Sequence, residues 1–360
     1  MQSSYQYRIR CNRPQHSPTI INTLLKADIP ILMNIITADL MGYQRVFPTI
    51  RIILINWNRQ YHDDAMNSLF RTIYSMGPTS VRVRFGRAWR LRGLINRLRF
   101  PQSKVDDRLS RTKIFFLLGS GRCGTLLISR MLNKSPDAVV LHEPHRHCDL
   151  AVRADCRQYP EKALHYTRKF RKYEIFKKIR ERHADIYGEI SSPLRCLGGA
   201  LAQTLPSAQF MILVRDGRAT IRSAMNRQLP KKGKHNHPLI MPLPDDQPYF
   251  DRWENMTDFE KTCWWWMDCY RTLLNHLPDS PIVHFERITK EYDYVNEHIL
   301  EPVGLKLTQQ QYDESMGKKS ANAAQQYTIP HWNDWDETMR KQFDEICGET
   351  MQRLGYERHW

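Results

Sequence analysis

The stretch FFLLGSGRCGTLL, from Phe115 to Leu127, limits the possible folds more than any other part of the chain. Its continuous apolar run predicts a strand that is covered on both faces, as in a parallel sheet. The glycines predict a tight turn, and the residues after them predict a helix at 125–133. Such a unit presents backbone N–H groups and a helix N-terminus to an anion. We therefore predict an anion-binding loop, and a glycine turn without a ligand is the alternative.

The chain after Arg111 continues to alternate between short apolar runs and helical patterns. Besides the strand at 113–118, strands are predicted at 138–141, 210–214 and 282–285. Further helices are predicted at 160–183, 217–227, 259–277 and 335–354. Strands that alternate with helices predict the α/β class, here a three-layer sandwich with a central parallel sheet of the P-loop type.

The glycine spacing at 119–124 matches the phosphate loop G-x-x-x-x-G-K-[ST], but two groups of that loop are missing. Thr125 stands at the lysine position, and Leu126 stands at the Ser/Thr position that ligates Mg²⁺. Leucine cannot bind the metal that nucleoside triphosphatases use to neutralise phosphate charge. A kinase or nucleotide hydrolase is therefore disfavoured and is kept as an alternative. Arg122 and Thr125 suit an anion of lower charge that needs no metal, such as a phosphosulfate.

A second candidate anion site follows the strand predicted at 210–214. Arg215 lies at the C-terminal end of that strand, where open parallel sheets bind ligands. Ser223 follows eight residues later, about two turns along the predicted helix. We expect Arg215 and Ser223 to grip a second phosphate together. The structural alternative is that Arg215 pairs with Asp216 or caps the helix.

Together the two motifs resemble the sulfotransferase superfamily that uses 3′-phosphoadenosine-5′-phosphosulfate (PAPS) as its donor. The string VRDGRA at 214–219, followed by Ser223, is most similar to the protein-tyrosine sulfotransferases, and the resemblance covers residues 113–355. It implies a metal-free enzyme that moves a sulfuryl group to a hydroxyl of a carbohydrate, a peptide tyrosine or a small molecule. It also implies that the donor is bound by Ser120, Gly121, Arg122, Cys123, Gly124, Thr125, Arg215 and Ser223.

Transfer to a hydroxyl requires a base for the acceptor proton, and VVLHEPHRH at 139–147 is the candidate segment. It follows a predicted strand, so we expect it near the phosphate loop at the same rim of the sheet. The resemblance implies Glu143 as the base and Arg122 as a second catalytic residue. His142 and His145 are the rivals, because histidine is the commonest general base. A salt bridge from Glu143 to a neighbouring arginine is the structural alternative.

One position departs from the superfamily pattern. Many relatives carry a lysine upstream of the second motif, where it touches the donor near the bond that breaks. The corresponding segment here is YGEISSPLR at 187–195, with Glu189 or Ile190 at that position. Arg195, or a basic residue from 160–183, could supply the missing charge.

The first 110 residues lie outside the resemblance and hold most of the excess charge. They carry 17 basic and 6 acidic residues, which is +11 of a net charge of +16. We therefore predict a basic N-terminal extension at 1–110 and a sulfotransferase domain at 111–360. Another interpretation is that translation starts at Met66 and that the preceding residues do not belong to the protein.

The segment 81–101 contains seven arginines. One interpretation is a solvated linker or helix. The other is an arm that makes a peripheral contact with anionic lipid or an acidic polymer. The apolar contacts of such an arm would be Phe85, Trp89 and Leu94. A basic protein that only binds nucleic acid or membrane is an alternative function, but it leaves both anion motifs without a purpose, so no nucleic acid is expected.

Other features bear on the acceptor and the compartment. The Lys/Arg-rich stretch 168–182 could attract an acidic polysaccharide or peptide, although a solvated helix face is the alternative. The eight cysteines are scattered without a CxxC pair, which fits a reducing compartment. The best apolar run, 29–41, contains Asp39 and is shorter than the roughly 20 residues that a membrane span needs. We therefore predict a cytoplasmic protein.

Overall fold

The computed structural model describes residues 89–226, 241–317 and 327–357. All described residues belong to one compact unit, which spans residues 70–360. Met66 and Phe85, which the sequence singled out, lie outside the described residues, as does the end of the helix predicted at 217–227.

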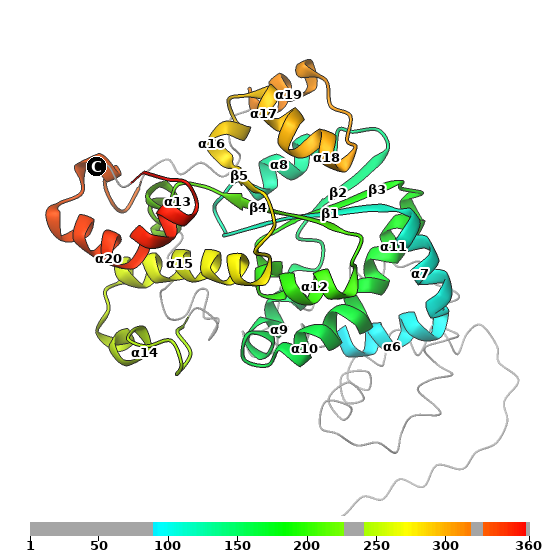
Figure 1. Ribbon diagram of the computed structural model, residues 1–360, viewed down its shortest axis with the longest axis horizontal. Helices are drawn as coiled ribbons and strands as arrows, with labels where there is room; N and C mark the ends of the chain where they lie inside the picture. Colours follow the sequence, from blue (N-terminus) through cyan, green and yellow to red (C-terminus); the bar gives the residue numbers. More distant parts are fainter. Residues whose placement is uncertain (1–88, 227–240, 318–326, 358–360) are drawn as a thin grey trace, which may run out of the picture. The chain divides into compact units, whose positions relative to one another are not determined.

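Five strands form one sheet in the order β2-β3-β1-β4-β5, and every neighbouring pair is parallel. Figure 1 shows this sheet between two groups of helices. The arrangement confirms the predicted α/β class with a central parallel sheet. The strands are β1 (Lys113–Gly119), β2 (Ala138–His142), β3 (Ile186–Ser191), β4 (Gln209–Val214) and β5 (Ile282–His284).

The side chains of β1 alternate between two apolar cores, because successive residues of a strand point to opposite faces of the sheet. Phe116 and Leu118 belong to the core on one face, and Phe115 and Leu117 to the core on the other. All four are fully buried. The sheet that contains β1 is therefore covered by helices on both faces and forms the middle layer of three, as the apolar run predicted.

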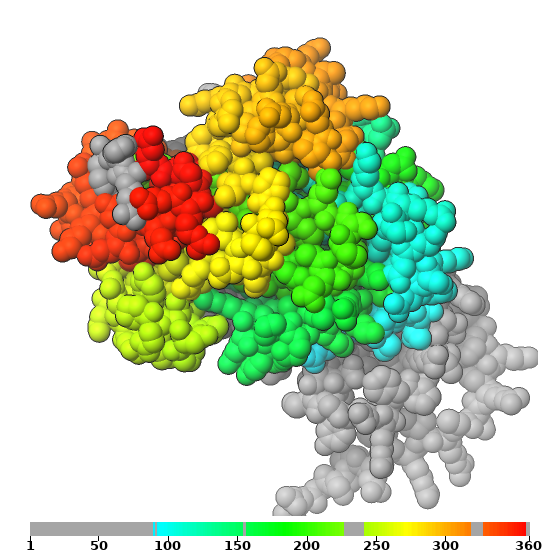
Figure 2. Space-filling view, viewed as in Figure 1, coloured from blue at the N-terminus to red at the C-terminus, as the bar shows by residue number. Residues whose placement is uncertain are grey.

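The larger group of helices covers the face that Phe116 occupies. In Figure 2 much of this group is green at the bottom of the view. Its members are α6 (Trp89–Arg99), α7 (Gln102–Arg111), α9 (Arg146–Gln158), α10 (Pro160–Tyr166), the π-helical turn η1 (Thr167–Arg171), α11 (Lys172–Arg182), the 3-10 turn η2 (Pro193–Leu197), α12 (Gly198–Thr204), α13 (Gly217–Met225), α14 (Tyr249–Arg252), the 3-10 turn η3 (Trp253–Asn255), α15 (Asp258–His276), the 3-10 turn η5 (Trp332–Asp334) and α20 (Glu337–Arg353).

A smaller group covers the other face, where it packs on Phe115 and Leu117. It is drawn mainly in orange at the top of Figures 1 and 2. Its members are α8 (Thr125–Leu132), α16 (Phe285–Ile288), α17 (Tyr292–Val295), the π-helical turn η4 (Asn296–Leu300), α18 (Glu301–Val303) and α19 (Gln309–Met316).

Two helices that precede the predicted domain boundary at residue 111 pack into the larger core. Trp89 at the start of α6 is 6% exposed, and its ring meets the ring of Tyr166 edge-on at 4.9 Å between centroids. Phe100 and Leu109 belong to the same core. Trp89, which the sequence offered as an apolar contact for lipid, is therefore a core residue.

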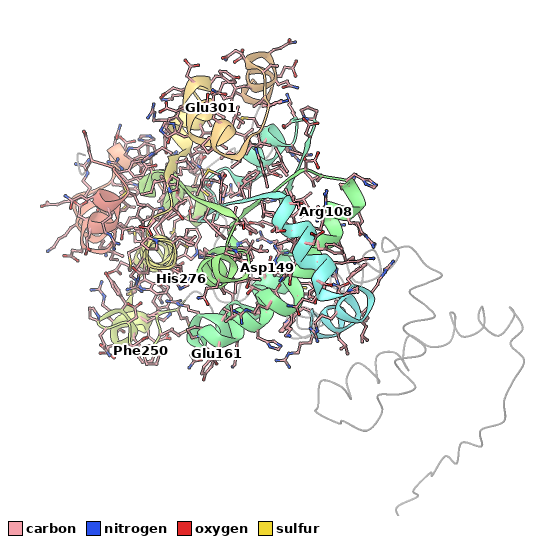
Figure 3. All side chains as sticks on the ribbon, turned by 45° about the vertical axis from the view of Figure 1, so that its right-hand side comes forward. Arg108, Asp149, Glu161, Phe250, His276 and Glu301 are labelled. Carbon is pink, nitrogen blue, oxygen red and sulfur yellow. The ribbon has the colours of Figure 1, made fainter. Side chains whose placement is uncertain are left out.

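The strand β3 was not predicted, although it lies next to β1 in the centre of the sheet. Its pattern contains Glu189, which is fully buried and forms an ion pair with Arg171 of η1. Arg171 is also 3.4 Å from Asp149 Oδ1, and Figure 3 shows Asp149 among the helices of the larger group. This ionic cluster allows a charged residue to occupy a central strand.

The helices predicted at 125–133, 259–277 and 335–354 match α8, α15 and α20 to within about three residues at each end. The helix-prone stretch 160–183 is helical throughout but contains the π-helical turn η1. Within the described ranges, no helix combines the length and the apolar character that a membrane span requires.

Candidate functional site

The two predicted anion motifs lie together at the C-terminal ends of adjacent strands. In the register of the sheet, Gly119 at the end of β1 pairs with Leu213 near the end of β4. Across this junction Arg122 Nε donates a hydrogen bond to Ser223 Oγ at 3.0 Å. Arg215 Nη1 donates to the Arg122 carbonyl at 2.9 Å. The guanidinium of Arg122 from the first loop and the guanidinium of Arg215 and hydroxyl of Ser223 from the second motif therefore form one polar cluster.

The loop between β1 and α8 is held in shape by its own buried groups. The Cys123 thiol donates to the Ser120 carbonyl at 2.6 Å, and burial raises the pKa of this thiol to about 12, so the thiol stays protonated and unreactive. Ser120 Oγ lies 3.1 Å from the hydroxyl of Tyr270, which donates to the Leu213 carbonyl. The side chains of Ser120 and Cys123 thus shape the loop from within.

Gly124 occupies a position that only glycine can fill. Its φ of +85° lies in the left-handed region, and an added Cβ would come within 2.1 Å of the Phe285 ring. This close approach positions the first turn of α8, whose backbone N–H groups face the loop. Thr125, the first residue of α8, has the buried hydroxyl that the sequence placed beside the anion.

The alternative role for Arg215, pairing with Asp216, is not what the structure shows. Asp216 caps α13 by accepting from the N–H of Arg218, and its carboxylate pairs with the Arg218 guanidinium at 2.6 Å. The Arg215 guanidinium instead stacks over the Phe285 ring at 5.1 Å. Among the described residues it forms no ion pair, so its charge is available to a ligand.

His142 at the end of β2 reaches the same cluster. Its Nε2 lies 2.9 Å from Thr125 Oγ1, with the direction of donation set by the tautomer. Burial, only partly opposed by the charge of Glu143, lowers the pKa of His142 below its ordinary value of 6.5. The imidazole is therefore neutral at pH 7 and has one nitrogen able to accept a proton.

Glu143 follows His142 and is buried with both carboxylate oxygens engaged. Oε1 accepts from the Ser192 hydroxyl at 2.6 Å and from the Ser192 N–H at 3.2 Å, and Oε2 accepts from Arg146. Burial alone would raise the pKa of Glu143, but Arg146 and Ser192 outweigh it and hold the pKa below its ordinary value of 4.5. Glu143 is thus ionised, and the arginine salt bridge considered as its structural alternative is present.

Backbone strain gathers at the two residues that the resemblance named as catalytic. Arg122 has a φ of 72° and Glu143 has a φ of 45°, a region that costs a non-glycine residue about 1–2 kcal/mol. The only other described non-glycine residue with positive φ is His183, which caps the C-terminus of α11. No sequence pattern indicated this strain. The hydrogen bonds of Arg122 with Ser223 and of Glu143 with Ser192 hold the two side chains of these strained residues.

His145, the second rival base, is not part of this cluster. It is buried with its Nε2 3.6 Å from Glu174, under the helices α6 and α11. Burial and the nearby Arg171 charge lower the pKa of His145 well below 6.5, so it is a neutral core residue.

The segment expected to carry the missing lysine forms β3 and the turn η2. Glu189 and Ile190 are buried within the strand, and the charge of Glu189 is used by Arg171, the basic residue that reaches it from 160–183. Arg195 lies just beyond, buried, with Nη1 donating to the Ser192 carbonyl at 3.0 Å. Arg195 and the basic residues of 160–183 were the candidates to replace the missing lysine. Arg195 is connected to Glu143 through Ser192, which contacts both residues.

No protein-family model and no curated protein matches the chain. Solved structures with a similar fold include a sulfotransferase from Alicyclobacillus acidocaldarius, at 12% identity over 68% of this chain and 96% of that chain, with a TM-score of 0.38. Mouse sulfotransferase SULT7A1, complexed with PAP, is 15% identical over 67% of this chain and 85% of that one, with a TM-score of 0.39. Sulfotransferase STF9 from Mycobacterium avium is 12% identical over 80% and 90%, with a TM-score of 0.44. Similarities at this level carry no argument about ligands or chemistry.

Proposed function

We propose that this chain is a sulfotransferase that moves the sulfuryl group of PAPS to an acceptor hydroxyl. The observation that carries the proposal is the hydrogen bond between Arg122 and Ser223, because it joins the two predicted anion motifs into one site. PAPS carries a phosphosulfate at the 5′ position and a phosphate at the 3′ position of one adenosine. A protein that binds both groups needs two anion-binding motifs that lie no farther apart than the two ends of one nucleotide. Leu126 beside the loop makes a metal-dependent nucleotide hydrolase the weaker candidate.

The residues of the site fit such a donor chemically. Its charged side chains at the loop are Arg122 and Arg215, and guanidinium groups bind phosphate oxygens through paired N–H donors. The N-terminus of α8 adds backbone N–H groups, and Thr125 and Ser223 add hydroxyls. When bound, PAPS supplies an activated sulfuryl group whose transfer needs no metal.

In this assignment the residues divide the binding of the donor and the transfer of the proton between them. Ser120 to Thr125, with Arg122 foremost, hold the 5′-phosphosulfate end, and Arg215 and Ser223 hold the 3′-phosphate. Arg122 also offers positive charge where negative charge grows on the departing phosphate. Glu143 accepts the proton of the acceptor hydroxyl. His142 is the rival for that step, since its neutral imidazole contacts Thr125.

A ligand-induced stability measurement tests the proposal. Adenosine 3′,5′-bisphosphate in EDTA should raise the melting temperature by about 3–5 °C at 100 times its dissociation constant, since a ligand that binds only the folded state stabilises it by about 2.7 kcal/mol there. Arg122→Met should lose most of this gain. The matched control is Arg130→Met, an exposed arginine on the same helix as Thr125, which should keep it.

Two results would count against the proposal. Stabilisation by Mg-ATP, with none by the bisphosphate, would identify a nucleotide hydrolase or kinase. An absence of stabilisation by either nucleotide would mean that the two motifs do not form a nucleotide site.

A further inference from the structure

Two buried arginines, Arg153 of α9 and Arg195 of η2, have guanidinium groups that no carboxylate neutralises by direct contact. Each is 4% exposed, and the Nε of each has no hydrogen-bond partner. Neither forms an ion pair with any residue in the described ranges. The helix α9 packs on η2, and the charge of Arg195 acts on Arg153.

This arrangement is costly for the fold. Removing an ion from water costs several kcal/mol unless a partner of opposite charge repays it. Burial, followed by repulsion from Arg195, lowers the pKa of Arg153 to about 10. Burial also opposes the charge of Arg195, but its neighbours, Asp268 and Glu143 among them, outweigh burial and raise its pKa. The charge that is least compensated in this interior region is therefore that of Arg153.

The same interior pairs its other arginines. Arg171 contacts Asp149 and Glu189, and Arg157, one turn after Arg153 on α9, contacts Asp268 at 2.7 Å. Asp268 is near enough to act on the charge of Arg153, but its contacts are with Arg157 and Arg271. Of the three buried arginines in the described residues, Arg153 and Arg195 are thus the two without a carboxylate in direct contact.

One residue connects this pair to Glu143. The N–H and hydroxyl of Ser192 donate to Glu143 Oε1, and the carbonyl of the same residue accepts from Arg195 Nη1. Arg195 is therefore one residue removed from the carboxylate assigned as the base. It follows β3, whereas Arg122 and Arg215 follow β1 and β4.

We propose that Arg153 and Arg195 bind an oxyanion, a carboxylate or a sulfate, that the acceptor carries in addition to its reactive hydroxyl. The proposal rests on the sulfotransferase assignment and narrows it to acceptors that are already anionic. The oxyanion supplies a direct anionic contact that neither guanidinium has within the fold, and an acceptor for the Nε of each. Its position beside Ser192 directs the hydroxyl of the same molecule toward Glu143.

Inorganic sulfate is the probe, used with adenosine 3′,5′-bisphosphate at saturation so that the donor contacts are filled. Sulfate and chloride are compared at equal ionic strength, because sulfate also stabilises proteins without binding to a site. The variants are Arg153→Met, which removes one charge of the pair, and Arg157→Met, which removes an equally long, ion-paired arginine from the same helix. The melting temperature is followed against sulfate concentration.

We expect sulfate to stabilise the wild type and Arg157→Met through a saturable site, and Arg153→Met to bind it at least tenfold more weakly. Without sulfate, Arg153→Met should melt above the wild type, because an uncompensated charge has been replaced by an apolar chain of similar length. Arg157→Met should melt below the wild type, because Asp268 loses a partner.

Three results would overturn the proposal. The first is an equal response to sulfate in wild type and Arg153→Met. The second is a lower melting temperature for Arg153→Met than for wild type, which would make Arg153 a structural cation. The third is a tenfold loss of bisphosphate affinity in Arg153→Met, which would assign the pair to the donor. A wild type that does not bind the bisphosphate would instead contradict the sulfotransferase assignment, and the sulfate comparison would still report on the arginines.

Discussion

Arg122 Nε donates to Ser223 Oγ at 3.0 Å, although 101 residues separate them in the sequence. The contact places the loop after β1 against the helix after β4, and both structures belong to neighbouring strands of one parallel sheet. Two sequence motifs that each suggest an anion thereby become parts of a single site.

This contact predicts that the two residues act as a unit in binding adenosine 3′,5′-bisphosphate. Arg122→Met should weaken binding by about 10–100-fold, the value of one or two charge-assisted hydrogen bonds, and Ser223→Ala by about 3–10-fold. The double variant should lose less than the product of the two, because either change breaks the same contact. Isothermal titration calorimetry on the four proteins measures this coupling, and strictly multiplicative losses would show that the residues act independently.

Glu143→Gln should lower kcat by about 10²–10⁴-fold, since glutamine keeps the shape but cannot take a proton. The affinity for the bisphosphate should change less than about threefold, because Glu143 contacts Ser192 and Arg146 rather than the loop. His142→Gln is the companion variant, and we expect a smaller loss of kcat from it. A larger loss in His142→Gln than in Glu143→Gln would transfer the role of base to the histidine.

The dependence of kcat on pH separates the same two candidates. The pKa of Glu143 lies below 4.5, so its carboxylate is ionised throughout the range from pH 8 down to pH 5.5, and the rate should be flat there. Burial holds the pKa of His142 below 6.5, so a histidine base would give a rate that falls as the pH drops below 6.5. An acidic limb in the wild type that His142→Gln removes would contradict Glu143 as the base.

Gly124→Ala should destabilise the fold by at least about 2 kcal/mol, which combines the cost of a left-handed φ with a clash against Phe285. Gly121→Ala is a control in the same loop, because its Cβ would meet Trp265 no closer than 3.6 Å and its φ is not in that region. It should cost less than 1 kcal/mol. Differential scanning calorimetry measures both, and equal losses would mean that the loop rearranges around Gly124.

The effect of Asp149→Asn on stability, relative to wild type, should become more favourable as the pH rises. Burial, opposed by the Arg171 ion pair and assisted by the charge of Glu189, raises the pKa of Asp149 from 3.8 to about 7. A carboxyl whose pKa is raised in the fold favours folding when protonated, so wild-type stability falls as pH rises from about 4 to 7. Asparagine does not titrate.

The difference in melting temperature, Asp149→Asn minus wild type, should therefore increase by about 3 °C or more between pH 5 and pH 8. Asp185→Asn is the matched control, because its carboxylate is 83% exposed, and its difference should stay constant. An Asp149→Asn difference that does not change with pH would mean that Asp149 is ionised in the fold at both values.

Much of the sheet could be predicted because its strands are continuous apolar runs. The strands at 113–118, 138–141, 210–214 and 282–285 each match an observed strand to within one residue. The strand β3 could not be predicted from an apolar run, because Glu189 interrupts its apolar residues. Only the tertiary contact with Arg171 explains how that carboxylate is tolerated, and such a contact leaves no local pattern in the sequence.

The site shows the same division between local and long-range information. Arg122, Thr125 and Arg215 were selected because each follows a strand of a parallel sheet, and Ser223 because it lies about two helical turns after Arg215. The contact between Thr125 and His142, and the distance of His145 from the loop, depend on how β2 and α9 pack. Likewise, the arginine spacing of 81–101 was compatible with a solvated linker or helix and with a lipid-binding arm. Residues 89–99 form the helix α6, and the burial of Trp89 depends on tertiary packing that the local pattern does not encode.

β3 lies between β2 and β1 in the sheet. The edge strand β2, which ends at His142 and is followed by Glu143, therefore shares no backbone hydrogen bonds with β1 or β4, the strands that precede the two anion motifs. The edge strand instead meets the loop after β1 through side chains and through α8, as in the contact of His142 with Thr125. Under the proposed function, the strand that precedes the base is thus coupled to the donor loop by side chains, which substitution can alter, and not by a shared ladder of backbone hydrogen bonds.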